Sequence, residues 1–534
     1  MARASSRRSR RRFLKESAIL IGAATVQDSI RDNGPRAEFD VIIVGAGSAG
    51  CVLANRLSAN PQTRVLLLEA GGPAVHPLIA MPGRWTSLIG SAVDWNYATE
   101  PAPGLGGRSI RWPRGKTYGG SSAIGAMAYV RGHQLCFDGW AAGAGASWRF
   151  HEVLPYFRRA EDNSRGGSDY RGAGGPLAVA DTTDPHAGHL AFLDAAREHG
   201  FTARPDWDFN GARQEGGAGF YQKNIRHGRR HSVADAYLAP ALGRPNLVVW
   251  PHAQALRLVI ERARATGVEV ARGRSTEVVR ARREVVLAGG VVETPKLLML
   301  SGIGPADALR ALGLPVVRDL PGVGRNLQDH LRVAVRWAAT RPLAPSSVSA
   351  GLFTFTRRGA AARPPDIQFY VGRGLEAPDA FVTLSVVHSQ PASRGVVALR
   401  SADPLAPPVI TTNYLAEPGD LEALVEAVRL AQSLAESNAY AAVRGAPADP
   451  DARVRTTDEL RAFIRGTADT IFHPVGTCRM GRGPDAVVDS DLRVHGLAGL
   501  RVADASVVPE NVNSQTNAAC VMIGEKAAEL VQRG

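Results

Sequence analysis

The 534-residue sequence has few cysteines and no long apolar run. Its four cysteines, Cys51, Cys136, Cys478 and Cys520, are far apart and form no CxxC pair. This spacing argues against a disulfide framework and against a metal site, and small buried side chains are the better interpretation. No stretch of about 18 uninterrupted apolar residues occurs, so we expect no transmembrane segment.

Aromatic residues make up only 6% of the chain and do not alternate with basic residues in a stripe. The formal net charge is +13, but residues 1–24 contribute seven Lys or Arg against one Glu, and the remaining excess is scattered. We therefore expect no nucleic-acid binding. The length and the 45% hydrophobic content instead predict a globular protein with at least two packed lobes.

The first 26 residues have the order of a targeting segment. Ser9–Lys15 (SRRRFLK) resembles the twin-arginine export motif, and the apolar stretch Ser17–Val26 that follows is too short to span a bilayer. Residues 1–26 are therefore predicted to direct export, by the route that carries folded proteins, to the periplasm or the exterior. The alternative is a disordered basic arm on a cytoplasmic protein.

A glycine pattern marks a nucleotide site. Gly45, Gly47 and Gly50 follow the apolar run 41–44 directly, a helix-like stretch comes next, and a second apolar run ends on Glu69. Strand, glycine turn, helix, strand and acid in this order predict dinucleotide binding. Gly45 would permit the turn, Gly47 would let the backbone approach a pyrophosphate, and Gly50 would let the helix pack on the sheet. Glu69 would take the ribose hydroxyls, but the motif does not separate FAD from NAD.

Further motifs lie in order along the chain. They are DWNYATEP (94–101), RGKTYGGSSAIGAMAYVRG (114–132), GGVVETPKLLMLSGIG (289–304), LPGVGRNLQDH (320–330), HPVGT (473–477), LRVADASVVPE (500–510) and NAACVMIGEKAAEL (517–530). With the glycine motif they resemble the glucose-methanol-choline (GMC) oxidoreductase family, most closely its choline dehydrogenase-like bacterial branch, from about residue 38 to 531. The resemblance implies FAD and the oxidation of an alcohol CH–OH group to the carbonyl, by hydride transfer to flavin N5.

The resemblance also implies an α/β fold with two lobes. The first is a discontinuous, Rossmann-like FAD-binding domain, which takes residues 38–150, 210–325 and 470–531. The second is an α+β substrate-binding domain built on an antiparallel sheet, which takes residues 151–209 and 326–470.

Local patterns predict several elements of the second lobe. Residues 381–387 and 396–400 read as strands, and residues 341–365 read as loop. Residues 420–435 predict an amphipathic helix with Asp420 as N-cap and with Leu421, Leu424, Val425 and Val428 facing inward.

Carried over residue by residue, the family pattern implies a set of FAD contacts. Asp504 and Ala505 would contact the ribityl and phosphate part, Ala255 would contact adenine through its backbone, and Asn517 and Ala518 would cap the C-terminal helix. Ile124 stands where some members carry a histidine bonded to the flavin, so the FAD is expected to be non-covalent. The expected contacts are Gly45, Gly47, Ser48, Gly50, Glu69, Ala70, Gly120, Ser121, Gly125, Ala126, Ala255, Asp504, Ala505 and Asn517.

His473, in HPVGT, corresponds to the active-site base of the family. A neutral imidazole can take the hydroxyl proton while a hydride leaves the carbon. The second active-site position falls on Gln515, which can donate a hydrogen bond to the alcohol oxygen but cannot act as a base. Asn513 and Asn517 are alternatives if the loop shifts by two residues. Without the family context, His473 would read as a histidine in a buried turn.

Arg332 bears on the substrate. Choline oxidases have a glutamate at this position, two residues past the QDH motif, that helps to hold the trimethylammonium group. Arg332 would repel such a cation, so choline is disfavoured, whereas a carboxylate or a polar neutral alcohol would suit it. The side chain could equally face solvent.

Two questions about the chemistry stay open at this point. Export favours a dehydrogenase that passes electrons to a quinone or cytochrome over an oxidase that uses oxygen. The other functions to consider are a GMC-like hydroxynitrile lyase and a flavin protein without chemistry, which Gly125 and Gln515 keep in play.

Overall fold

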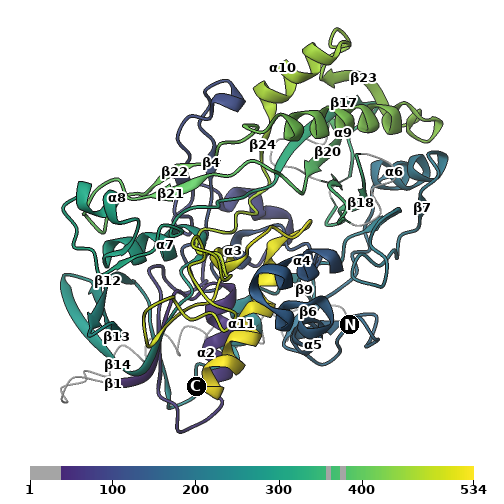
Figure 1. The fold of residues 1–534 in the computed structure, drawn as a ribbon. Coiled ribbons are helices and arrows are strands. Elements are labelled where there is room, and N and C mark those ends of the chain that lie inside the picture. Colours follow the sequence, from purple (N-terminus) through teal and green to yellow (C-terminus); the bar gives the residue numbers. More distant parts are fainter. Residues whose placement is uncertain (1–37, 345, 357–362, 373–379) are drawn as a thin grey trace, which may run out of the picture. The chain divides into compact units, whose positions relative to one another are not determined.

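The computed structural model describes residues 38–344, 346–356, 363–372 and 380–534 (Figure 1). The predicted export segment 1–26 lies outside the described residues, as does part of the predicted loop 341–365. Within the described ranges, no helix is long and apolar enough to cross a membrane.

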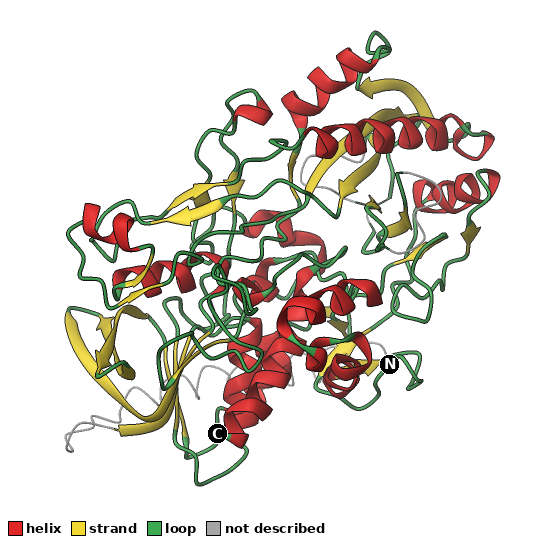
Figure 2. Cartoon of the chain, viewed as in Figure 1, coloured by secondary structure: helices red, strands yellow, loops and turns green. Residues whose placement is uncertain are grey.

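A seven-stranded sheet carries the glycine motif (Figure 2). Its strand order is β11-β2-β1-β14-β13-β12, with β25 beside β14. The pairs β1–β2, β11–β2 and β14–β25 are parallel, whereas β12, β13 and β14 run antiparallel to one another. The strands are β1 (Glu38–Val44), β2 (Val65–Leu68), β11 (Leu247–Trp250), β12 (Ala253–Glu261), β13 (Arg264–Arg272), β14 (Ser275–Leu287) and β25 (Leu500–Val502).

Two helices that are far apart in sequence, α2 (Ser48–Leu57) and α11 (Thr516–Arg533), lie side by side (Figure 1). The two helices can approach this closely because Gly524 has no Cβ. A Cβ there would stand only 2.9 Å from Val52 Cβ. The prediction that Asn517 and Ala518 cap α11 was wrong: Gln515 is the N-cap, and both residues lie in the first turn.

An eight-stranded sheet forms the second layer. Its order is β23-β17-β20-β19-β18-β8-β7, with β24 beside β17, and only β7 and β8 pair in parallel. β8 comes from the range 210–325 yet belongs to this sheet. The strands are β7 (Thr202–Ala203), β8 (Gly217–Phe220), β17 (Leu331–Ala339), β18 (Ala350–Thr354), β19 (Ile367–Val371), β20 (Phe381–His388), β23 (Arg444–Asp449) and β24 (Asp469–Thr470).

Two local predictions in this region are confirmed and two are corrected. β20 and β21 (Val396–Ala398) match the predicted strands. β18 lies inside the stretch predicted as loop, because its short apolar run pairs with both β8 and β19. The predicted helix is α9 (Pro418–Glu436), but Glu417 is its N-cap, and Asp420 instead accepts hydrogen bonds from the 392–393 turn.

The inward face of α9 is as predicted, since Leu421, Leu424, Val425 and Val428 are all buried. The other α-helices of the described residues are α3 (Ser121–Ile124), α4 (Gln134–Ala144), α5 (Phe150–Ala160), α6 (Ala187–Glu198), α7 (Gly290–Leu300), α8 (Ala306–Ala311) and α10 (Thr457–Thr467). Short strand pairs are β3 (Tyr97–Ala98) with β4 (Arg111–Trp112), β5 (Glu161–Asn163) with β6 (Leu177–Val179), β9 (Ile225–Arg226) with β10 (Arg229–Arg230), β15 (Ile303–Gly304) with β16 (Arg318–Asp319), and β21 with β22 (Val409–Thr411).

Candidate active site

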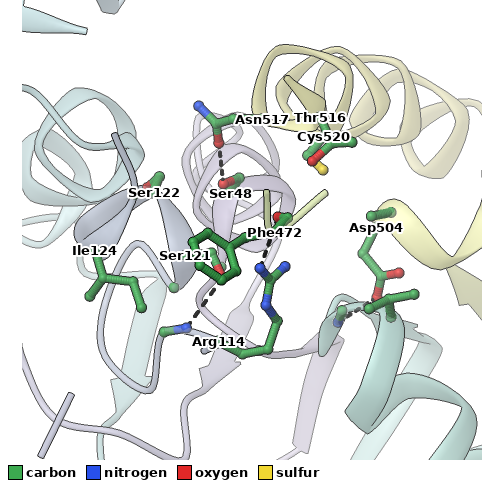
Figure 3. Close-up of a pocket in the computed structure, with 18 of the residues that line it drawn as sticks. Ser48, Arg114, Ser121, Ser122, Ile124, Phe472, Asp504, Thr516, Asn517 and Cys520 are labelled. Atoms are coloured by element: carbon green, nitrogen blue, oxygen red, sulfur yellow. Dashed lines mark hydrogen bonds between the residues drawn. The ribbon is translucent and has the colours of Figure 1, made fainter. Parts of the chain in front are cut away.

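One cavity takes its lining from both large sheets and from α2, α3, α7 and α11. We call it the cofactor cavity. Figure 3 shows lining residues of α2, α3 and α11. Every sequence-predicted site residue except Gly50 lines it, namely Gly45, Gly47, Ser48, Glu69, Ala70, Gly120, Ser121, Gly125, Ala126, Ala255, His473, Asp504, Ala505, Gln515 and Asn517. The fold therefore gathers side chains from both ends of the described chain around one space.

The glycine loops fit a pyrophosphate. Gly45 has a φ of +104°, and a Cβ there would lie 2.5 Å from Ala288 O. A Cβ on Gly47 would meet no protein atom closer than 3.8 Å, so this backbone faces the open cavity at the start of α2. The N–H groups at a helix start favour an anion. Gly50 does not line the cavity but lets the first turn of α2 pack against the glycine loop, because a Cβ there would lie 1.9 Å from Gly45 O.

Two buried carboxylates line the cavity and accept backbone N–H groups. Glu69 accepts from Ala46 at 2.8 Å and from Gly71 at 2.7 Å, and burial raises its pKa to about 7. Asp504 accepts from the Gly290 amide at 2.8 Å, and burial raises its pKa too. Both carboxylates are thus fixed in place and could accept hydroxyl groups of a bound dinucleotide.

Short polar contacts tie the loops of the cavity together (Figure 3). Ser48 Oγ donates to Asn517 Oδ1 at 2.7 Å, which joins α2 to α11. Ile124 packs in an apolar cluster with Ile79 and Leu88 and offers no atom for a covalent bond to a flavin. Gly125 O accepts a 2.5 Å hydrogen bond from a buried arginine, so its position is fixed without a side chain.

The backbone of His473 is held on both sides. Its N–H donates to Asp329 Oδ1 at 2.8 Å, and its carbonyl accepts from Asn511 Nδ2 at 3.0 Å. The residue before it, Phe472, has a φ of +68°, which is rare for a bulky side chain. Arg114 donates to Phe472 O at 2.9 Å (Figure 3). These contacts fix the direction of the imidazole.

Asp329 is the hub of this arrangement, and sequence reasoning missed it although it lies in the LPGVGRNLQDH motif. The carboxylate is 5% exposed, and burial raises its pKa. It accepts five hydrogen bonds, from the amides of His330 and His473 and from the side chains of Trp112, Tyr414 and Thr470.

His473 faces a second histidine that sequence reasoning also missed. Its Nδ1 lies 3.1 Å from Nδ1 of His330, with the two rings nearly perpendicular. Burial, and then the nearby His330 and Arg114, hold the pKa of His473 well below its ordinary value of 6.5. Burial also lowers the pKa of His330, to about 3. Both rings are therefore neutral near pH 7.

The loop before α11 brings Gln515 to the cavity. Gln515 is 8% exposed, and its Oε1 has no partner among the described residues. The alternative Asn513 does not line the cavity, because its carboxamide bonds His133 N and Gln214 Oε1 instead. Arg332 also lines the cavity, is only 6% exposed, and pairs with Asp469 at 3.3 Å.

Metal ligands do not gather anywhere in the described part of the chain. All four cysteines lie in that part as free thiols, three of them buried and Cys520 on the cavity wall.

Comparison with known proteins identifies the family. A GMC oxidoreductase profile matches residues 39–332, and a second one matches residues 391–524. The chain belongs to this family. It is 40% identical to an oxygen-dependent choline dehydrogenase of Brucella anthropi, over 92% of this chain and 95% of that protein. It is 41% identical to the mitochondrial choline dehydrogenase of Mus musculus, over 93% and 89%.

Solved structures agree with the family assignment. Pyridoxine 4-oxidase from Mesorbium loti superimposes with a TM-score of 0.88 at 35% identity, over 93% of this chain and 99% of that one. A variant of the formate oxidase of Aspergillus oryzae gives a TM-score of 0.85 at 26% identity, over 94% and 99%. The predicted α/β fold and FAD cofactor are confirmed, and the protein is an FAD-dependent oxidoreductase of alcohols. Neither the fold nor these relatives favour the hydroxynitrile lyase alternative.

Proposed function

We propose that His473 is the base in this oxidation and that the protein is a dehydrogenase with non-covalent FAD. The observation that carries the proposal is the buried imidazole on the cavity wall, which Asp329 and His330 hold in one orientation. An alcohol loses a hydride readily only as its hydroxyl proton leaves, so a fixed base close to the cofactor supplies what the chemistry needs.

Two groups of cavity residues would hold different parts of the cofactor. Gly45, Gly47, Ser48, Glu69, Ala70 and Ala255 would hold the adenosine and diphosphate part, and Gly120, Ser121, Gly125, Ala126, Asp504, Ala505 and Asn517 would hold the flavin part. When bound, FAD would supply the hydride acceptor.

The His330 contact decides which nitrogen of His473 is basic. The 3.1 Å contact between the two Nδ1 atoms needs one ring to donate and the other to accept, and Nε2 of His330 is buried with no hydrogen-bond partner among the described residues. We assign the bridging proton to Nδ1 of His473, because that tautomer leaves its other nitrogen as the base, and Nδ1 of His330 then accepts. The remaining lone pair of His473, on Nε2, is then available to the alcohol proton.

Gln515 and Arg114 complete the site. As the proton leaves, negative charge develops on the alcohol oxygen, and a preorganised donor stabilises it. The carboxamide of Gln515 can donate there, and the guanidinium of Arg114, held by Phe472 O, adds a positive field. Asn517 is committed to Ser48, so its place is beside the cofactor.

Anaerobic reduction of the holoenzyme tests the proposal. A panel of alcohols is mixed with the yellow protein, and bleaching of the flavin band is followed. With a reducing alcohol, His473→Ala should slow bleaching by about 10²–10⁴-fold. The variant must retain FAD absorbance, and an unchanged rate would remove His473 from the mechanism.

The pH profile provides a second readout of the base. Because the pKa of His473 is depressed, the base form persists as pH falls below 6.5. The acid limb of the limiting rate should therefore lie below pH 6.5 and should be absent in His473→Ala. An acid limb at or above pH 6.5 contradicts the assignment.

The electron acceptor is a separate part of the proposal. We favour a quinone or cytochrome acceptor, and the printed name of the Brucella anthropi relative makes oxygen the competitor. Admitting air to the substrate-reduced enzyme separates them. If oxygen reoxidises the reduced flavin more slowly than the enzyme turns over with a quinone analogue, the protein is a dehydrogenase. If oxygen reoxidises the flavin as fast as the enzyme turns over, it is an oxidase.

Export rests on the segment 1–26 alone. We propose the twin-arginine route because Arg10 and Arg11 precede Phe13 and Leu14 in the expected pattern. The double variant Arg10→Lys and Arg11→Lys should leave the holoenzyme in the cytoplasmic fraction, whereas Arg7→Lys should not. Retention of the unaltered chain in the cytoplasm would mean that the segment is not a signal.

A further inference from the structure

Arg332 projects from the eight-stranded sheet into the cofactor cavity. It is the second residue of β17, and only 6% of it is exposed, so it is neither a solvent-facing arginine nor part of an apolar core. Asp469, on the paired strand β24, accepts from one terminal nitrogen at 3.3 Å. This contact orients the guanidinium, and arginine commonly binds two acceptors through different edges of its plane.

Two hydroxyl groups stand on the same face of the sheet. Ser385 on β20 pairs with Tyr370 on β19, and Arg332 pairs with Val387, two residues from Ser385. Residues that pair directly, and residues two apart in a strand, share a face. Both Ser385 and Tyr370 line the cavity. The phenol oxygen of Tyr370 accepts from Ser349 at 2.8 Å, so its own proton points elsewhere.

The sheet also places this polar group near the base. His330, whose ring contacts His473, immediately precedes β17, and Arg332 follows two residues later. Two residues of extended chain span roughly 7 Å. Arg332 and the base therefore belong to the same end of β17, an arrangement that suits a short substrate.

The carboxylates that line the cavity are engaged in other contacts. Glu69 and Asp504 accept backbone amides, and Glu293 accepts from Tyr97 at 2.5 Å and pairs with Lys296 at 3.5 Å. The cavity wall thus presents cationic and hydroxyl donors at its substrate end.

We propose that the substrate is a short hydroxy acid whose carboxylate binds Arg332, with Ser385 and Tyr370 as further donors. This inference rests on the proposed function, and it separates the protein from relatives named for choline. In the reaction, the carbinol hydrogen leaves with two electrons to FAD and the hydroxyl proton goes to His473. The C–O bond becomes C=O, and the product is the oxo acid with its carboxylate unchanged.

Binding is tested first, with a molecule that cannot react. 2-Hydroxy-2-methylpropanoate has no hydrogen on its carbinol carbon, and its primary amide is a neutral match. Calorimetry with the holoenzyme should show the acid binding at least about tenfold more tightly than the amide, the gain expected of a charged hydrogen bond. Arg332→Gln should remove that preference and leave amide binding within about twofold.

Arg336 provides the matched control. It lies on β17 two strand repeats further along the same face, pairs with Asp449 at 2.5 Å, and does not line the cavity. Arg336→Gln should leave both affinities unchanged. Equal binding of acid and amide, binding of neither, or an acid preference that survives Arg332→Gln would overturn the inference.

Flavin reduction then separates the inference from the proposed function. Lactate, lactamide and choline are compared anaerobically, with lactate expected to give the largest ratio of reduction rate to dissociation constant. If lactamide or choline reduces the flavin better, the proposed function stands and the hydroxy-acid substrate does not. If the unreactive acid binds through Arg332 but no alcohol reduces the flavin, the anion site stands and the proposed function fails.

Discussion

At the scale of single residues, His330 shows how one side chain can set the chemistry of another. Its ring does not line the cavity, yet in the proposed tautomer its Nδ1 accepts Nδ1–H of His473 and leaves Nε2 as the basic nitrogen of His473. The dependence is electronic as well as steric, because a neutral acceptor at Nδ1 also stabilises the imidazolium that forms when His473 takes the proton.

Two substitutions at His330 separate these effects. In His330→Asn the carboxamide oxygen can replace Nδ1 as acceptor, whereas His330→Leu removes the acceptor and keeps the bulk. We expect flavin reduction by the substrate to be slower in His330→Leu than in His330→Asn by about tenfold or more, measured at saturating substrate. Equal rates of flavin reduction in the two variants would show that His330 acts only through packing and not as a hydrogen-bond acceptor.

Glu69 gives FAD binding a pH dependence. Its folded pKa of about 7 lies above the ordinary 4.5, so the ionised form, which accepts ribose hydroxyls, develops as pH rises through 7. The dissociation constant of FAD from the apoprotein should fall by up to about tenfold between pH 6 and pH 8.

The control for this dependence is Glu69→Gln, which should bind FAD more weakly and with no change over the same range. The sign of this pKa shift can be checked by unfolding the apoprotein at several pH values. Burial penalises only the ionised form of Glu69, and in the unfolded chain this form develops above pH 4.5. The free energy of unfolding of the apoprotein should therefore fall as pH rises from 4.5 to 7. An affinity for FAD that weakens on the way to pH 8 would contradict this role.

At the scale of elements, α11 is anchored by one buried carboxylate. Glu525 is fully buried and accepts from Arg56 of α2, Arg159 of α5 and the Tyr237 hydroxyl. Through these bonds it aligns the start of α11, which carries Gln515 and Asn517, with the glycine loop at the start of α2.

Removing this charge should be costly. Glu525→Gln weakens the charged hydrogen bonds to two arginines whose side chains are 29% and 44% exposed, and it should lower the free energy of unfolding by about 1.5–3 kcal/mol. Glu529, one turn further along α11, is 31% exposed and also pairs with arginines, so Glu529→Gln should change it by about 1 kcal/mol or less. Urea unfolding of both variant holoenzymes measures the two changes in free energy of unfolding. Similar losses in the two variants would show that Glu525 does not anchor α11.

Elements also show what the sequence could and could not predict. β1, α2 and β2 follow from local apolar periodicity around the glycine motif, and His473 and Gln515 follow from motif positions. The strand β18 was missed because its stability comes from pairing with β8, more than 100 residues away. The contact of His330 with His473 and the inward direction of Arg332 were not predictable either, since both depend on the register of β17 with β20 and β24.

At the scale of the whole molecule, the cofactor is part of the fold. The cavity is lined by segments from Val44 to Cys520, so a ligand bound there would hold together parts of the chain that are far apart in sequence. FAD at 100 times its dissociation constant should stabilise the apoprotein by about 2.7 kcal/mol, and the melting temperature should rise with FAD concentration.

Gly120→Ala is the control for this linkage. Gly120 has a φ of +51°, and a Cβ there would lie 2.9 Å from Gly47 Cα, so the variant should distort the FAD loop. Its melting temperature should respond to FAD only at much higher concentrations. A response equal to that of the unaltered protein would show that FAD does not bind at these loops.

The place of β25 and α11 has a consequence for the order in which the enzyme is made. β25 pairs with β14 in the nucleotide sheet, Asp504 follows it, and Asn517 closes on Ser48. A nascent chain that has passed the glycine motif therefore lacks one wall of its cofactor site until residues 500–520 have been synthesised. The complete cavity can form only after these residues fold against β14 and α2.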